Sequence, residues 1–450
     1  MEINDAKDQN FVEKKSEISN RIKGQKRIEY NVAEYGKITE EIAWQYFKLN
    51  SKEDEELNAT HRIFIKDVLV REVDLVNNEI IKSDPKYEPY NFLRMDSVTF
   101  EKIQRQHFYD IINTFKCYRQ FNRRKVEKRI RFVANMSEKH QNLLRTYLKN
   151  LETVKISIDH NYEIFKLIIA EANNLFLNSP FGRTNSCDHL VVKPENELKI
   201  SRIDSVLNQI VREWSSQGLS ERDSCFLPII NAIEEYFPEK ENRSQIRILV
   251  PGCGLGRLPF EIAKRGYSSQ GNEFSLMMLL VANFILNKIK DIDLYRIYPW
   301  VTQFSHNFRT DHQTNPILFP DNNPSNLPKN VDFSMLAGSF VDVYNNSKNR
   351  ETFDCVTTCF FLDTASNIIE YIETIHLILK LDGIWINFGP LLYHYAEGLE
   401  PSIEPSYEIV KEIIKSFNFE FLCEKTDINC FYTRNPNSMA SFQYKSNVSI

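Results

Sequence analysis

The sequence lacks several features that would place it in other classes of protein. None of its eight cysteines belongs to a C-x-x-C pair, and in a chain of 450 residues they do not form the dense pattern of a disulfide scaffold. No segment has the roughly 18 consecutive apolar residues of a membrane helix, and the polar first residues do not resemble a signal peptide. We therefore expect a reducing compartment, the cytoplasm, with the nucleus as a second candidate.

An excess of positive charge is also missing. The chain has 56 Lys and Arg residues against 61 Asp and Glu residues, a formal net charge of −5. Without an overall cationic field, we expect binding neither to nucleic acid nor to a membrane surface. A local contact patch is one interpretation of the basic run 119–131, although a solvated helix face is the simpler one. His306, Asp311 and His312 have no matching second cluster, so no metal site is expected.

The hydrophobic pattern divides the chain into three predicted parts. Residues 1–95 are charged and weakly patterned, with strand-like alternation only at 67–76, so we predict an N-terminal extension of unknown role for which partial disorder is one interpretation. Residues 96–240 place apolar side chains at three- and four-residue spacing, which predicts a helical cap domain with a loop at 178–194. Residues 241–450 alternate short apolar runs with helical segments.

This alternation predicts an α/β domain with a mainly parallel, Rossmann-like sheet, preceded by the α-helical domain. Ligands of such sheets bind beyond the carboxyl ends of the strands. The predicted strands are 246–250, 268–272, 333–336, 353–361 and 384–388, and the late segments 419–424 and 431–433 suggest an antiparallel end. The predicted helices include 201–214, 228–236, 258–265, 276–287 and 367–379.

The strongest local signal is a glycine-rich segment at 247–273, RILVPGCGLGRLPFEIAKRGYSSQGNE. Gly252, Gly254 and Gly256 fall between a predicted strand and a predicted helix, where glycine lets the backbone turn tightly and approach a ligand. Glu273 ends the next predicted strand, where its carboxylate can accept both hydroxyls of a ribose. The G-x-G-x-G spacing favours S-adenosylmethionine over the G-x-G-x-x-G of dinucleotide folds, but a dinucleotide site and a purely structural turn remain alternatives.

From VPGCGLGRLPFEIAKRGYSSQGNEFSLMMLLVANFILN onward the sequence resembles the carnosine N-methyltransferase family. The likeness continues through FDCVTTCFFLDTASNIIEYIETI and DGIWINFGPLLYHY, and upstream through QIVREWSSQGLSERDSCFLPII, so that it covers roughly residues 100–445. The resemblance implies a class I methyltransferase fold with S-adenosylmethionine as cofactor. It also implies a small histidine-containing peptide as substrate, with methylation of carnosine to anserine, and a homodimer.

Carried over residue by residue, the resemblance implies two sets of contacts. The cofactor set is Gln209, Arg212, Gly252, Glu273, Ser339, Phe340 and Cys359. The substrate set is Asp363, His394, Tyr432 and Tyr444, with Asp363 and His394 as the catalytic pair. Arg212 would bind the methionine carboxylate and Glu273 the ribose, while Asp363 would accept the N–H of the far imidazole nitrogen and so hold the reactive tautomer.

The sequence departs from the family at two of the matched positions. Ser339 stands where the family has an aspartate that can accept the adenine amino group, and Phe442 replaces a substrate-side tyrosine. Simpler interpretations also exist: Asp363 as an acid near a helix N-terminus, His394 as a partly buried histidine, and Cys359 and the tyrosines as packing residues. Methylation of histidine in a longer peptide or protein, or a non-catalytic cofactor-binding scaffold, are the alternative functions.

Overall fold

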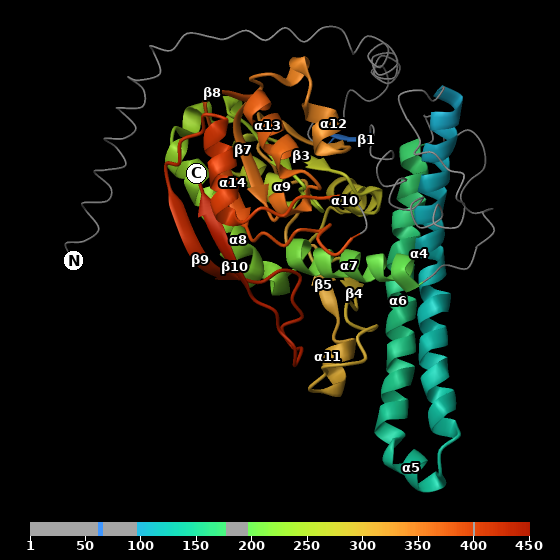
Figure 1. Cartoon of the computed structure of the whole chain (residues 1–450). Coiled ribbons are helices and arrows are strands. Elements are labelled where there is room, and N and C mark those ends of the chain that lie inside the picture. The colour runs from blue at the N-terminus through green and yellow to red at the C-terminus, as the bar shows by residue number, and fades with distance from the viewer. Residues whose placement is uncertain (1–61, 66–96, 177–196, 399–400) are drawn as a thin grey trace, which may run out of the picture. The chain divides into compact units, whose positions relative to one another are not determined.

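The computed structural model describes residues 62–65, 97–176, 197–398 and 401–450 (Figure 1). The predicted strand 67–76, the predicted loop 178–194 and nearly all of the predicted extension 1–95 lie outside the described residues. Within the described ranges, no helix combines the length and the apolar character needed to cross a membrane.

Eight of the described strands form one large sheet, in the order β1-β6-β3-β2-β7-β8-β10-β9. Their bounds are β1 Arg62–Ile65, β6 Phe333–Ala337, β3 Ser268–Glu273, β2 Arg247–Pro251, β7 Phe353–Cys359, β8 Leu379–Gly389, β10 Tyr444–Ser449 and β9 Glu424–Cys430. Neighbours from β1 to β8 are parallel, whereas β10 is antiparallel to both β8 and β9. This is the predicted Rossmann-like class I methyltransferase fold, with β1 as an additional parallel edge strand.

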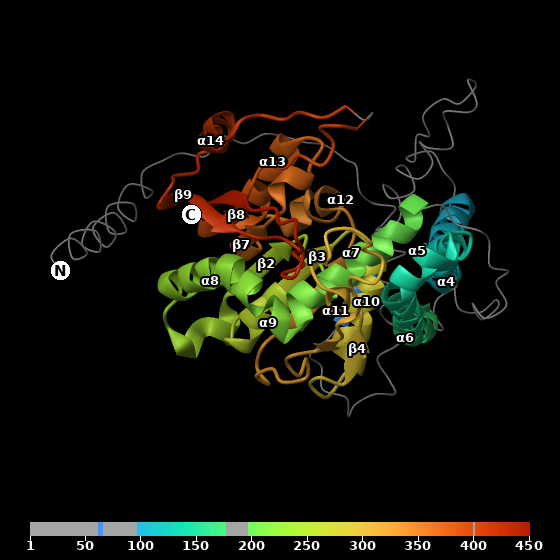
Figure 2. The same cartoon turned by 90° about the horizontal axis from the view of Figure 1, so that it is seen from below.

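Helices cover both faces of the sheet, as Figure 2 shows. On one face lie α8 (Leu219–Tyr236), α9 (Arg257–Lys264) and α10 (Leu276–Lys288); on the other lie α12 (Phe340–Tyr344), α13 (Ile368–Ile378) and α14 (Tyr407–Ser416). Successive strand residues supply the two cores in turn: Ile248 and Val250 of β2 belong to the first core, and Leu249 to the second. Burial on both faces explains why β2, with the sequence RILVP, is almost uniformly apolar, whereas β3 is mostly buried although its sequence, SSQGNE, is polar.

The helical part is built on a long antiparallel hairpin of α4 (Ser97–Ala134) and α6 (Arg145–Phe176), with α5 (Glu138–Leu143) at its tip (Figure 1). The hairpin packs through aromatic side chains, such as Tyr118 edge-on against Phe165 with ring centroids 4.9 Å apart. The next helix, α7 (Glu197–Trp214), packs against both α4 and α8 and leads toward the glycine-rich loop that follows β2.

Several predicted elements differ from the structure in their bounds. Helix α8 begins at Leu219, and Pro228 lies inside it rather than at its start. At the end of the sheet, β9 and β10 replace the predicted segments 419–424 and 431–433. Strand β9 has the sequence EKTDINC and is mostly exposed, so it carries no apolar alternation for a pattern to detect. A separate antiparallel pair, β4 (Tyr295–Ile297) with β5 (Ile317–Phe319), was not predicted.

Candidate functional site

The glycine-rich loop turns sharply between β2 and α9. Gly252, Gly254 and Gly256 have φ angles of 62°, 57° and 82°, in the left-handed region that side chains with a Cβ rarely adopt. A Cβ on Gly252 would lie 2.4 Å from Cδ2 of Phe361, and a Cβ on Gly254 would lie 2.4 Å from Oε1 of Glu213. The three glycines are therefore required by both backbone conformation and close packing.

Glu273, the last residue of β3, is fixed beside this loop by backbone amides. The Gly254 amide donates to Oε2 at 2.8 Å, and the Ser275 amide donates to Oε1 at 2.8 Å. A carboxylate offers about four acceptor positions, and these two bonds fix the orientation of the group beside the loop. This geometry suits the predicted role of accepting the two ribose hydroxyls.

A cavity of about 750 Å³ opens at the carboxyl ends of β2, β3 and β7. This position is the one expected for a ligand of a doubly wound sheet, and the volume lies within the usual range of small-molecule sites. Nine of the eleven predicted contact residues line it: Gln209, Gly252, Glu273, Ser339, Phe340, Asp363, His394, Tyr432 and Tyr444. Segments that are far apart in the sequence therefore meet at one cavity.

Asp363 lies in a short 3₁₀ turn after β7 and is 3% exposed. Its Oδ2 accepts a hydrogen bond from the Leu392 amide at 2.9 Å, and its carbonyl oxygen accepts one from the His394 amide at 3.0 Å. Burial raises the pKa of the Asp363 carboxyl. The side chain does not cap the following helix, because Asn367 is the N-cap of α13.

His394 follows β8 in the segment that Asp363 binds through its backbone. The residue is exposed, so its side chain lines the outer part of the cavity wall, whereas Asp363 is buried. A buried carboxylate and an exposed imidazole on one wall can bind the two ends of a polar substrate.

Three aromatic side chains meet on another part of the cavity wall. The Phe360 ring centroid lies 4.8 Å from that of Tyr432 and 6.3 Å from that of Tyr444. Phe360 has a φ of 53°, a strained value for an aromatic residue that places its ring in this cluster. Tyr432 is 38% exposed, and desolvation by the surrounding protein raises its pKa to about 12. The sequence prediction missed Phe360, because nothing in the run CFFLD separates it from a core residue.

Arg212 and Cys359, the other two predicted cofactor contacts, lie behind this aromatic wall and do not line the cavity. The Arg212 guanidinium lies 4.7 Å from the Tyr432 ring centroid, and its Nε forms an ion pair with Glu221 at 3.1 Å. Arg212 also donates to Sγ of Cys225 at 3.3 Å. The hydrogen bond with Cys225 and burial raise the pKa of the Cys359 thiol. Both residues thus support the wall from the side of α7 and α8.

The loop after β6 brings Ser339 and Phe340 to the cavity. Asn272 fixes this loop by donating to the carbonyl oxygens of Leu336 at 3.1 Å and Gly338 at 3.0 Å. Ser339 is the N-cap residue of α12 but its side chain makes no capping hydrogen bond. The substituted residue Phe442 is 79% exposed and does not line the cavity.

The described residues contain no group of three or more His, Cys, Asp and Glu side chains with the geometry of a metal site. Asp311 pairs with Arg309 at 3.0 Å, and Nδ1 of His312 lies 3.2 Å from the carbonyl oxygen of Asn437.

Comparisons with known proteins agree on one family. A family model described as carnosine N-methyltransferase matches residues 189–449. The chain is 42% identical over 348 residues to the carnosine N-methyltransferase of Rattus norvegicus, covering 77% of this chain and 85% of the rat protein. It is 40% identical over 357 residues to the carnosine N-methyltransferase of Dictyostelium discoideum, covering 76% of this chain and 75% of that protein. It is 35% identical over 352 residues to the carnosine N-methyltransferase of Schizosaccharomyces pombe, covering 74% of this chain and 92% of that protein. This chain belongs to the carnosine N-methyltransferase family.

Proposed function

We propose that this chain uses S-adenosylmethionine to methylate an imidazole nitrogen of carnosine, giving anserine. The observation that carries the proposal is that one cavity of about 750 Å³ has both the Glu273 side of the glycine loop and the Asp363 turn in its wall. The named relatives are carnosine N-methyltransferases, and this chain covers 85% of the rat protein.

The residues around the glycine loop fit S-adenosylmethionine. The left-handed glycines keep the loop free of side chains, and the Glu273 carboxylate is held beside it by the Gly254 and Ser275 amides. We assign Glu273 to the ribose, and Ser339 and Phe340 to the adenine. Gln209 and Gly252 line the same cavity, and Arg212 and Cys359 support it from behind. The cofactor supplies a methyl group on a positively charged sulfur.

Asp363 and the aromatic wall are assigned to the substrate. The buried carboxylate accepts the N–H of the far imidazole nitrogen, which leaves the near nitrogen with its lone pair, in the way a triad carboxylate orients its histidine. Tyr432 and Tyr444 pack on the substrate and exclude water, and His394 binds it from the outer part of the wall. Alignment and desolvation are the main contributions that a protein makes to a displacement reaction of this kind.

The test is a methyl-transfer assay with labelled S-adenosylmethionine and the full chain. Carnosine, free histidine and a histidine-containing protein extract are offered separately, and the methylated nitrogen is identified by mass spectrometry and NMR. Methylation of carnosine at an imidazole nitrogen supports the proposal. Methylation only of proteins in the extract would replace carnosine with a longer substrate, and cofactor binding without transfer to any of them would indicate a scaffold.

We further propose that the chain forms a homodimer in the cytoplasm, with the nucleus as a second location. Light scattering after gel filtration and microscopy of the tagged full chain test these two points. The division into an extension at 1–95, a helical cap at 96–240 and a cofactor-binding domain at 241–450 is likewise a proposal. Limited proteolysis of the full chain should cut first near residue 95 if the extension is correct, whereas the helical cap and the cofactor-binding domain share one hydrophobic core and should unfold together.

A further inference from the structure

Glu213 is a buried acid that the proposed chemistry does not use. It lies in the last turn of α7, one residue after Arg212, and is 2% exposed. Burial raises the pKa of its carboxyl, and the Arg212 guanidinium and the backbone amides of Arg257 and Leu255 oppose this rise. Burying a carboxylate is costly unless its oxygens are hydrogen-bonded, so the partners of Glu213 indicate why it is there.

Those partners belong to the glycine-rich loop. Oε1 of Glu213 accepts hydrogen bonds from the Leu255 amide at 3.2 Å and from the side-chain amide of Gln209, and Oε2 accepts one from the Arg257 amide at 3.0 Å. Leu255 follows the second glycine of the motif, and Arg257 is the first residue of α9. A side chain of the helical part therefore satisfies the backbone donors of the loop that follows β2.

Gly254 lies between two carboxylates. Its amide donates to Glu273 on one side at 2.8 Å, and a Cβ on Gly254 would be 2.4 Å from Oε1 of Glu213 on the other. A shift of Glu213 would thus displace the peptide that orients Glu273, the residue assigned to the ribose.

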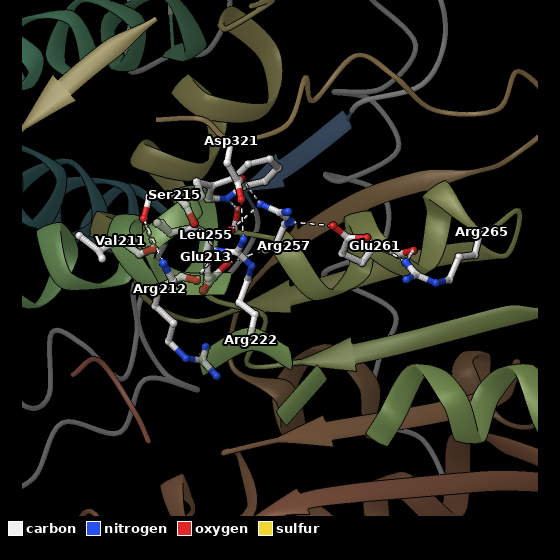
Figure 3. A network of polar contacts seen from close by, with 12 residues as sticks. Val211, Arg212, Glu213, Ser215, Arg222, Leu255, Arg257, Glu261, Arg265 and Asp321 are labelled. Atoms are coloured by element: carbon white, nitrogen blue, oxygen red, sulfur yellow. Dashed lines mark hydrogen bonds and ion pairs between the residues drawn. The ribbon is translucent and has the colours of Figure 1, made fainter. Parts of the chain in front are cut away.

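The end of α7 is itself fixed by a network of charged groups, shown in Figure 3. Arg257 donates from Nη1 to the Glu213 carbonyl oxygen at 2.7 Å and to Asp321 at 2.5 Å. Arg222 donates to the carbonyl oxygens of Arg212 at 2.8 Å and Ser215 at 2.7 Å, and it pairs with Asp321. The last carbonyl groups of α7 are thereby satisfied, and the Glu213 carboxylate is held at one position against the loop.

We propose that Glu213 is a positioning residue that holds the glycine-rich loop in its cofactor-binding conformation, and that it sets the affinity for S-adenosylmethionine without contacting the substrate. The inference rests on the proposed function. It assigns to α7 a task beyond carrying Gln209 and Arg212: the helix shapes the loop from the side opposite Glu273.

The test is Glu213→Gln, with the dissociation constant of S-adenosylmethionine measured by calorimetry on the full chain. The amide keeps the shape of the side chain but faces one backbone N–H donor with its own NH₂ group, so the loop must move. We expect the dissociation constant to rise by about tenfold to 100-fold. At saturating S-adenosylmethionine, kcat and the KM for carnosine should stay within about twofold of the original values, because only cofactor binding is affected.

A matched control is Glu261→Gln on α9. Glu261 is a partly buried carboxylate that, like Glu213, lies beside Arg257; Arg257 donates to it at 2.9 Å, but its side-chain partners are arginines and not loop amides. This variant should keep its affinity for S-adenosylmethionine even if its melting temperature falls. If Glu213→Gln does not fold, Glu213→Asp replaces it, since the shorter acid keeps the charge but cannot reach both loop amides.

Each outcome bears on a different statement. Weaker cofactor binding in the Glu213 variant, with unchanged binding in the Glu261 variant, supports the proposal. Unchanged binding in a folded Glu213 variant, or equal losses in both variants, overturns it and leaves Glu213 as a structural group. If the unmodified chain itself does not bind S-adenosylmethionine, the proposed function fails, which this series detects before any variant is compared.

Discussion

Glu273 is a side chain with a structural role in the loop and a proposed role in binding. Its carboxylate accepts the Gly254 and Ser275 amides, each at 2.8 Å, and is assigned to the ribose. Glu273→Ala should therefore weaken S-adenosylmethionine binding, because each hydroxyl loses a charged acceptor worth roughly 1.5–3 kcal/mol. Calorimetry measures the change. Unchanged affinity in a folded variant would remove Glu273 from the ribose site.

Asp363 is the residue on which the proposed catalysis most depends. In Asp363→Asn, the remaining oxygen can still accept the Leu392 amide, so the new NH₂ group turns toward the substrate and favours the unreactive imidazole tautomer. Turnover of carnosine should fall by up to about 10⁴-fold, the size of the effect in the triad precedent, while S-adenosylmethionine affinity stays nearly intact. If the variant instead melts much earlier and loses the cofactor, Asp363 serves only to hold the segment around His394.

The pH dependence follows from the same residues. The imidazole of carnosine must be neutral to react, and Asp363, whose pKa is raised by burial, must be ionised to accept its N–H. Both requirements remove activity as the pH falls, so kcat/KM for carnosine should rise with pH through an apparent pKa of about 6.5. Desolvation by the surrounding protein raises the pKa of Tyr432 to about 12, so this tyrosine should cause no loss of activity below pH ~10. A decrease of kcat/KM that begins near pH 8 would require another titrating group.

Among the elements, those buried on both faces were predicted close to their true bounds. The predicted strand 268–272 corresponds to β3, Ser268–Glu273, and the predicted helix 276–287 corresponds to α10, Leu276–Lys288. The mostly exposed strand β9 was misplaced, because pairing with β10 rather than burial of an apolar face defines it. The start of α8 was misplaced because Pro228 suggested a first turn, whereas the helix begins at Leu219.

The hairpin of α4 and α6 is anchored by one fully buried amide. Asn161 of α6 donates to the Tyr118 hydroxyl at 3.0 Å and to the Tyr298 carbonyl oxygen at 2.8 Å, and it accepts the Tyr298 amide at 2.7 Å. Asn161→Ala should lower the free energy of unfolding by about 2–3 kcal/mol, because buried groups lose their partners. Asn150→Ala, on the same helix, removes only one part-buried bond to Gln313 and is the control in urea titrations. Equal effects of the two variants would contradict this anchoring role.

Across the whole molecule, motifs within one short segment could be predicted from the sequence, whereas contacts between distant segments could not. The glycine motif and Glu273 could be predicted because their spacing within one strand–helix–strand unit reflects the geometry of the ligand. The contacts of Glu213 with Leu255 and of Phe360 with Tyr432 join segments more than 40 residues apart, as the Glu213–Leu255 hydrogen bond spans 42 positions. No periodicity records such contacts, because they depend on how α7 and the end of the sheet fold onto the loop.

One hydrophobic core extends from the hairpin to the sheet, through Phe115, Phe165, Trp214, Ile248 and Phe388. The predicted boundary at residue 240 therefore divides the sequence but not the core, and we expect the two parts to unfold together. Hydrogen exchange measured by mass spectrometry along a urea series should show peptides of α6 and β8 losing protection at the same urea concentration.

S-adenosylmethionine at about 100 times its dissociation constant should raise the free energy of unfolding measured at the peptides of both α6 and β8 by about 2.7 kcal/mol, because Gln209 of α7 and Glu273 of β3 line one cavity. The Glu273→Ala variant at the same cofactor concentration should show a much smaller gain. Earlier loss of protection in α6, or a gain confined to β8, would mean that the hairpin unfolds as a separate unit.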